Sequence, residues 1–256
     1  MFKYLKYELK GSYKLPLGLL ILMILWCPIL YSRIGVWSNV GISSLAILTC
    51  IGAILTTFIY VIHLYKQDFS EDRGYLTFTL PLKGRSILWG KFLLSFIWLV
   101  IIGIGCLSFV AIIFIKGFDA SVSLSINLFD SVLLISIFMG IVYLILSIFL
   151  AITLSKVALR NRRLGGISFV IFILLNSAVG FLNLLLIKSF PQGLELPTGK
   201  IINMVDLNSG YVNITTSNNV LTPYLYINIA SAIFYVALVI GLFIFNSYLI
   251  DRKMDL

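Results

Sequence analysis

The sequence has few charged residues and very few groups that could carry out chemistry. Only 11% of its 256 residues are Asp, Glu, Lys or Arg, whereas soluble domains have about 25%. It contains one histidine, His63, and three cysteines, Cys27, Cys50 and Cys106, which lie within apolar runs and lack the spacing of a metal site or a disulfide framework. The scarcity of charge excludes an ordinary soluble domain, because too little polar surface would remain to cover a chain that is 60% hydrophobic.

Long apolar runs occupy the parts of the sequence that lack charged residues. Backbone groups in lipid must be hydrogen-bonded within the protein, so each span must be a helix or a strand of a closed barrel. Barrel strands alternate apolar and polar residues over about 10 positions, but the runs here are continuous and long enough for helices. We therefore expect an all-α, polytopic membrane protein with one membrane domain over residues 1–256. The six predicted spans are 15–32, 41–65, 87–115, 128–154, 166–188 and 224–250. Pro16 suits the start of the first span, and Pro28 predicts a kink or an early end.

The basic residues indicate the orientation. Six spans place both termini on one side, and Lys and Arg are concentrated on the cytoplasmic side of membrane proteins. The side of the termini carries 15 of the 19 basic residues; the other side carries Arg33, Lys116, Lys188 and Lys200. Both termini are therefore expected in the cytoplasm. Topology and contact with anionic lipid explain the net charge of +9, so no nucleic-acid partner is expected.

Two segments outside the predicted spans have patterns of their own. Residues 1–14 place Phe2, Leu5 and Leu9 on one helical face and lysines elsewhere, which is typical of an amphipathic helix lying in the cytoplasmic interface. The same helix could instead merely extend the first span. Residues 189–223 form a long extracellular loop, and a connection of this length usually carries function or a small fold of its own.

The segment Lys66–Lys91 holds 8 of the 29 charged residues and lies between two predicted spans. A topology signal needs only Lys and Arg, yet the acidic Asp68, Glu71 and Asp72 stand here beside Phe69. Gly74 follows them as a plausible helix stop. A helix that docks into a groove on a partner requires an apolar anchor of this kind. The other interpretation is a solvated loop with lysine side chains extended along the membrane surface.

Neutral polar and small residues recur at helical spacing in three spans. They are Thr49, Ala53, Thr56, Tyr60 and His63 in the second span, Ser136, Gly140, Tyr143 and Ser147 in the fourth, and Asn176, Gly180 and Asn183 in the fifth. Such stripes are first a signal for helix packing in lipid. The sharper interpretation is that the stripes of the second and fifth spans face a substrate path or a dimer axis.

The segment after the second span resembles a motif of a known family. Its marks are the acidic and aromatic run from Asp68 to Arg73, then Gly74-Tyr75-Leu76, Leu80-Pro81 and Gly90-Lys91. Together with the six-span plan, the amphipathic N-terminal helix and the long loop before the last span, they resemble the membrane subunit of type-2 ABC exporters. The architectural resemblance covers the whole chain, and the motif covers about 25 residues.

The resemblance implies a permease without a catalytic site or cofactor of its own. Two separate cytoplasmic ATPase subunits would bind ATP and Mg²⁺, and a second permease subunit, expected to be an identical copy, would complete a dimer in the bacterial plasma membrane. The coupling region, residues 66–86, would contact the ATPase. The implied contact residues are Asp68, Phe69, Ser70, Glu71, Asp72, Arg73 and Gly74, with Arg160, Arg162 and Arg163 as a second contact. The implied path and dimer residues are Thr49, Thr56, Tyr60, Asn176, Gly180 and Asn183.

Other functions are weighed against this one. The neutral stripes and the apolar surroundings favour an amphipathic or hydrophobic substrate, a peptide before a lipid or a drug. An ion-coupled secondary transporter would normally place ionisable groups deep in the membrane, and Asp130 lies near the outer end of its span. A membrane sensor or scaffold without transport is a further alternative, in which residues 189–223 bind a ligand. An intramembrane enzyme has no plausible catalytic group in this sequence.

Overall fold

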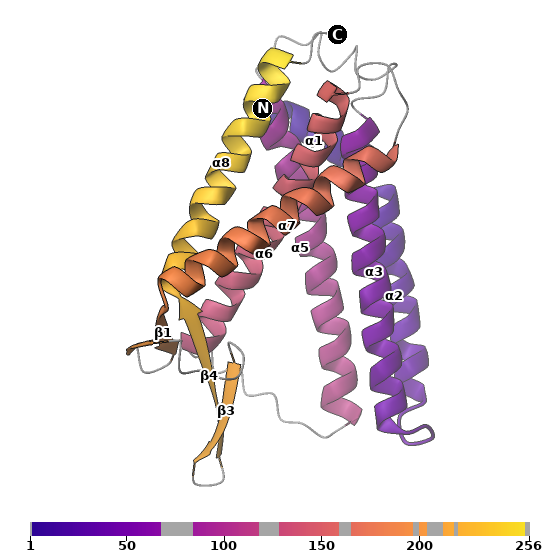
Figure 1. Cartoon of the computed structure of the whole chain (residues 1–256). Coiled ribbons are helices and arrows are strands. Elements are labelled where there is room, and N and C mark those ends of the chain that lie inside the picture. The colour runs from indigo at the N-terminus through magenta and orange to yellow at the C-terminus, as the bar shows by residue number, and fades with distance from the viewer. Residues whose placement is uncertain are drawn as a thin grey trace. The chain divides into compact units, whose positions relative to one another are not determined.

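A computed structural model describes residues 2–67, 84–117, 128–158, 165–196, 200–203, 212–217 and 220–253. These ranges contain seven helices and four strands (Figure 1). The chain divides into two compact units: residues 1–124 with 254–256 form unit 1, and residues 125–253 form unit 2. Each unit is described by itself below.

Six helices are long and apolar enough to cross a bilayer, which confirms the predicted polytopic all-α fold. They are α2 (Lys14–Ser32), α3 (Asn39–Gln67), α5 (Gly84–Gly117), α6 (Leu128–Ala158), α7 (Gly165–Ser189) and α8 (Ile229–Lys253). Pro16 lies in the first turn of α2, as expected for a helix start. Of the kink or early end predicted at Pro28, the early end does not occur, because α2 continues through this residue to Ser32, where the predicted span ends.

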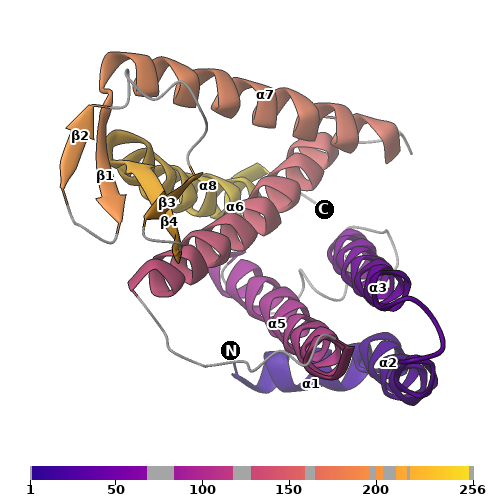
Figure 2. The same cartoon turned by 90° about the horizontal axis from the view of Figure 1, so that it is seen from below.

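Unit 1 is a bundle in which α2, α3 and α5 lie side by side and the amphipathic helix α1 (Phe2–Ser12) packs against α5 and α2 (Figure 2). Its core combines side chains of α3 with those of α2 and α5. The α3 side contributes the small residues Ala46, Cys50 and Ala53, which let two helices approach closely in lipid. The thiols of Cys50 and Cys106 lie 3.7 and 3.8 Å from each other's backbone carbonyl oxygens across the α3–α5 contact.

Unit 2 is a bundle of α6, α7 and α8, with α6 packed against both of the others. The C-terminal half of α6 is largely buried, including Phe149 and Leu146. Polar side chains join the helices there. Thr153 Oγ1 donates to Asn246 Oδ1 of α8 at 2.8 Å, and the Ser155 and Ser168 hydroxyl oxygens lie 2.6 Å apart between α6 and α7.

A small antiparallel sheet lies between α7 and α8 in the chain, at the end of α8 opposite the C-terminus (Figure 1). Its strands are β1 (Gln192–Leu196), β2 (Ile201–Asn203), β3 (Val212–Ser217) and β4 (Val220–Asn228), in the order β2-β1-β4-β3. The described parts of residues 189–223 thus form a small fold of their own, one of the two expectations for this segment.

The predicted start of the last span at residue 224 is wrong, because β4 runs to Asn228 and α8 begins at Ile229. The apolar run does not stop at this boundary, which is why hydropathy alone misplaces it. Asn228 sets it instead: its Oδ1 accepts a hydrogen bond from the Ser231 backbone N–H at 2.9 Å, as an N-cap does. Its Nδ2 donates to the Phe190 carbonyl oxygen at 2.7 Å and so joins the end of the sheet to the end of α7.

Candidate functional site: a polar clamp on the N-terminal helix

The N-terminal helix α1 has one face turned into unit 1. That face carries Leu5, Glu8, Leu9 and Ser12, which are half-buried or buried, while Lys6 and Lys10 are exposed. The spacing of three and four residues is that of one helical face. Leu5 and Leu9 therefore lie together, as the sequence predicts, and the face also contains two polar residues.

Glu8 forms an ion pair with Lys91 of α5. Lys91 Nζ lies 2.9 Å from Glu8 Oε2, and the two side chains are 3% and 25% exposed. A buried ammonium group is strongly destabilising unless a partner compensates its lost hydration. The Glu8 carboxylate supplies that compensation, so the ion pair holds α1 against the first turns of α5.

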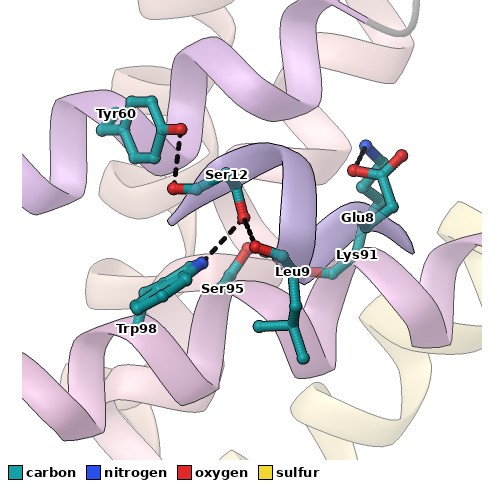
Figure 3. Close-up of polar contacts among 7 residues, drawn as sticks. All are labelled: Glu8, Leu9, Ser12, Tyr60, Lys91, Ser95 and Trp98. Carbon is teal, nitrogen blue, oxygen red and sulfur yellow. Dashed lines mark hydrogen bonds and ion pairs between the residues drawn. The ribbon is translucent and has the colours of Figure 1, made fainter. Parts of the chain in front are cut away.

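Ser12, at the end of α1, connects the same helix to both α3 and α5 (Figure 3). Trp98 Nε1 of α5 donates to Ser12 Oγ at 3.0 Å. The Tyr60 hydroxyl of α3 donates to the Ser12 carbonyl oxygen, also at 3.0 Å. Carbonyl groups in the last turn of a helix have no partner within the helix, and Tyr60 provides one here. Glu8, Ser12, Tyr60, Lys91 and Trp98 are called the α1 clamp below.

A polar groove of about 480 Å³ opens beside the α1 clamp, between α1 and α3. Its lining residues are Tyr7, Glu8, Gly11, Ser12, Tyr60, His63, Leu64 and Gln67. His63 is exposed there, in agreement with an interfacial position. The groove reaches Gln67, the last residue of α3, and so adjoins the start of the charged segment.

Three of the predicted path residues lie on α3, and they differ in their surroundings. Thr49 is half-buried and Thr56 is exposed. Their hydroxyls donate to carbonyl oxygens of their own helix, Ala46 at 2.8 Å and Gly52 at 2.6 Å. Tyr60 belongs to the α1 clamp. The stripe thus lies beside the buried face of α3, and its polar groups at Thr56 and His63 point away from the core of unit 1.

The other three predicted path residues lie on α7, where two of them join helices within unit 2. Asn176 Oδ1 accepts a hydrogen bond from the Tyr143 hydroxyl of α6 at 2.8 Å. Asn183 Oδ1 accepts one from the Ser231 hydroxyl of α8. Gly180 is exposed, and a Cβ added there would meet no atom within 4 Å. Asn176 and Asn183 therefore contribute to the packing of the helices of unit 2. That packing does not require a glycine at position 180.

The predicted ATPase contacts lie outside the described residues. These are Asp68, Phe69, Ser70, Glu71, Asp72, Arg73 and Gly74, and Arg160, Arg162 and Arg163. The helices on either side of the first set are described. Because α3 and α5 pack together, residues 68–83 connect two neighbouring helices of one bundle.

Sequence reasoning missed the α1 clamp, although two signals for it were present. Glu8 is the only Asp or Glu among the first 67 residues. Lys91 lies inside the predicted span 87–115, where a charged group needs a partner. Pairing this acidic residue with the lysine near the start of the third predicted span would have suggested the contact.

No protein-family model, no curated protein and no solved structure matches this chain. Within the described ranges, no three His, Cys, Asp or Glu side chains come together as a metal site would require.

Proposed function

We propose that this chain is the membrane subunit of an ATP-driven ABC exporter in the bacterial plasma membrane. In this proposal two cytoplasmic ATPase subunits bind ATP and Mg²⁺, and the chain itself has no catalytic site. A second copy of the chain completes the translocation path for an amphipathic or hydrophobic substrate, with a peptide favoured. The six spans, the amphipathic helix α1 and the family-like motif between the second and third spans support it.

The observation that carries the proposal is the α1 clamp. Residues 68–83 connect the end of α3 to the start of α5, and Lys91 lies about two turns into α5. Glu8 ties that part of α5 to α1, and Ser12 ties α1 to Tyr60 of α3. A partner that displaced residues 68–83 would therefore move α1, α3 and α5 together.

The polar side chains of α3 support the assignment of a path or a dimer axis to this helix. Thr56 and His63 are exposed on a helix that is long and apolar enough to cross a membrane. Exposure of polar groups on a spanning helix is typical of a surface that faces protein or a water-filled path. The salt bridge of Lys91 lies near the cytoplasmic end of α5 and not deep in a span, which gives less support to an ion-coupled transporter.

Co-purification with a phosphate-loop ATPase encoded beside this chain tests the proposal. The wild-type chain is expected to retain the ATPase through size-exclusion chromatography in detergent. The double charge reversal E71K/D72K is expected to weaken assembly or to uncouple ATP hydrolysis. The matched control E195K reverses a charge in β1, on the outer side, and is expected to assemble normally. Normal binding and normal coupling of E71K/D72K would show that the segment does not dock the ATPase.

The outer sheet is the observation that favours the second candidate, a membrane sensor without transport. A folded sheet between α7 and α8 provides more structure than a plain connection requires. The two functions differ in their need for the ATPase. A sensor would retain its function when residues 68–74 are replaced by a neutral Gly/Ser linker, whereas the proposed exporter would lose it.

A further inference from the structure

An apolar groove of about 600 Å³ runs between α2 and α5 of unit 1. Met23 and Phe109 form its buried floor, and Ile24 and Ile112 are exposed along its sides. The groove extends along α2 from Leu20 to Tyr31. At 1.5 Å per residue this is roughly 16 Å, about half of the 30 Å hydrocarbon core of a bilayer. The groove therefore matches one leaflet in length.

The topology places this groove in the outer leaflet. With the termini in the cytoplasm, as the distribution of basic residues predicts, α2 and α5 both run outward, and the groove follows the C-terminal part of each helix. Tyr31 lines the outer end and is exposed. Trp37, in the turn that follows α2, is also exposed, and these two residue types are enriched where the hydrocarbon core meets the headgroups.

Two cationic side chains, Arg33 and Lys116, lie near the outer end of the groove. Arg33 caps the C-terminus of α2, and Lys116 lies one helical turn beyond Ile112 on the same face of α5. Both are exposed. The Arg33 guanidinium lies 5.7 Å from the centre of the Trp37 ring. Among the residues that the structure describes, neither cation is in a salt bridge.

We propose that this groove binds an anionic phospholipid of the outer leaflet. One acyl chain fills the space between α2 and α5, and the headgroup phosphate contacts Arg33 and Lys116. The apolar lining lies at the depth of the acyl chains and suits an acyl chain. The two cations lie at the depth of the headgroups and suit an anionic phosphate. This side of the membrane holds only four basic residues, and two of them are at the mouth of this groove.

Lipid titration followed by native mass spectrometry tests the headgroup contact. The purified chain is titrated with phosphatidylglycerol or with phosphatidylcholine of the same acyl chains. Wild type is expected to retain phosphatidylglycerol preferentially, and R33Q/K116Q is expected to lose about 30-fold in that affinity, roughly fivefold for each cation. The control K188Q/K200Q removes the other two outer cations and is expected to bind as wild type does. Equal loss in the control, or no loss in R33Q/K116Q, would overturn the proposal.

A phosphatidylglycerol with a photoreactive diazirine in one acyl chain tests the location. Cross-links are expected in peptides that contain residues 20–31 and 105–112. The variant S108F fills the groove from α5 and is expected to lose these cross-links. Even labelling of all the spans would indicate ordinary surrounding lipid. A cross-linker that joined two copies of the chain through this groove would assign it to a dimer interface. Either result would overturn the proposal, and R33Q/K116Q provides a test even if S108F fails to fold.

Discussion

Replacing Glu8 by Gln tests whether the ion pair is what holds α1 in place. The substitution keeps the size of the side chain and a hydrogen-bond acceptor, and it removes only the charge. Lys91, with a side chain that is 3% exposed, then remains buried without its carboxylate. Loss of one partner from a buried pair costs about 3–5 kcal/mol. Because the Glu8 side chain is 25% exposed, we expect the lower end of this range, about 3 kcal/mol.

Replacing Lys91, the other partner of the ion pair, is expected to lower the free energy of unfolding less than replacing Glu8 does. K91M removes the buried charge and leaves a Glu8 carboxylate that reaches water, so its expected cost is about 1 kcal/mol. In the double variant E8Q/K91M no charge is left buried, and the expected stability lies within about 1 kcal/mol of wild type. The double-mutant cycle should therefore give a coupling energy of about 3–5 kcal/mol.

Thermal unfolding in detergent, followed by tryptophan fluorescence, measures these differences. For a chain of this size E8Q should lower the Tm by roughly 6–12 °C, and K91M should lower it far less. The reasoning is refuted if E8Q and K91M have equal effects that simply add in the double variant. That result would mean that Glu8 and Lys91 contribute separately and that α1 is held by its apolar face.

Three further predictions concern the helix contacts. N246L loses the hydrogen bond from Thr153 Oγ1, but Thr153 can donate to the Phe149 carbonyl oxygen instead, and the substitution also removes the buried Asn246 Nδ2, which has no hydrogen-bond partner among the described residues. The Tm of N246L should therefore change little, whereas N176L loses two hydrogen bonds and should cost about 1–2 kcal/mol; equal effects would contradict this. G105A places a Cβ 2.9 Å from Leu20 Cδ2 of α2, the end of a flexible side chain that has to shift, whereas the Cβ of G103A meets no atom within 4 Å. Both variants gain helix propensity, so G105A should have the lower Tm of the two, and an equal or higher Tm of G105A would contradict this. T56F should retain the wild-type Tm, since Thr56 is exposed, yet weaken chain–chain cross-linking or ATPase stimulation; unchanged values of both would confine Thr56 to lipid contact.

The spans could be predicted from the sequence because each is a local property of an apolar run. Their ends could not always be predicted. Pro28 is compatible with a helix that continues to Ser32, since neighbouring helices in a membrane protein can satisfy the backbone groups that a proline frees. The start of α8 depends on an Asn228 cap and on strand pairing of β4 with β1, which hydropathy does not report.

The candidate site depends on contacts between distant parts of the chain. Glu8 and Lys91 are 83 residues apart, and Ser12 and Trp98 are 86 apart. A stripe pattern shows which residues share a helical face, but it does not say what that face meets. Asn176 and Asn183 thus form hydrogen bonds to neighbouring helices of unit 2, whereas Thr56 is exposed on the surface of unit 1. All three nevertheless belong to equally regular stripes.

Site-specific photo-cross-linking in cells tests the central claim most directly. A benzoylphenylalanine at position 69 replaces the apolar residue that is proposed to dock the ATPase, and one at position 201, in the outer strand β2, serves as the control. The account predicts that position 69 captures a phosphate-loop ATPase, identified by mass spectrometry, and that position 201 does not. Capture of lipid alone, or of proteins without a phosphate loop, would contradict the assignment of this chain as the membrane subunit of an ATP-driven exporter.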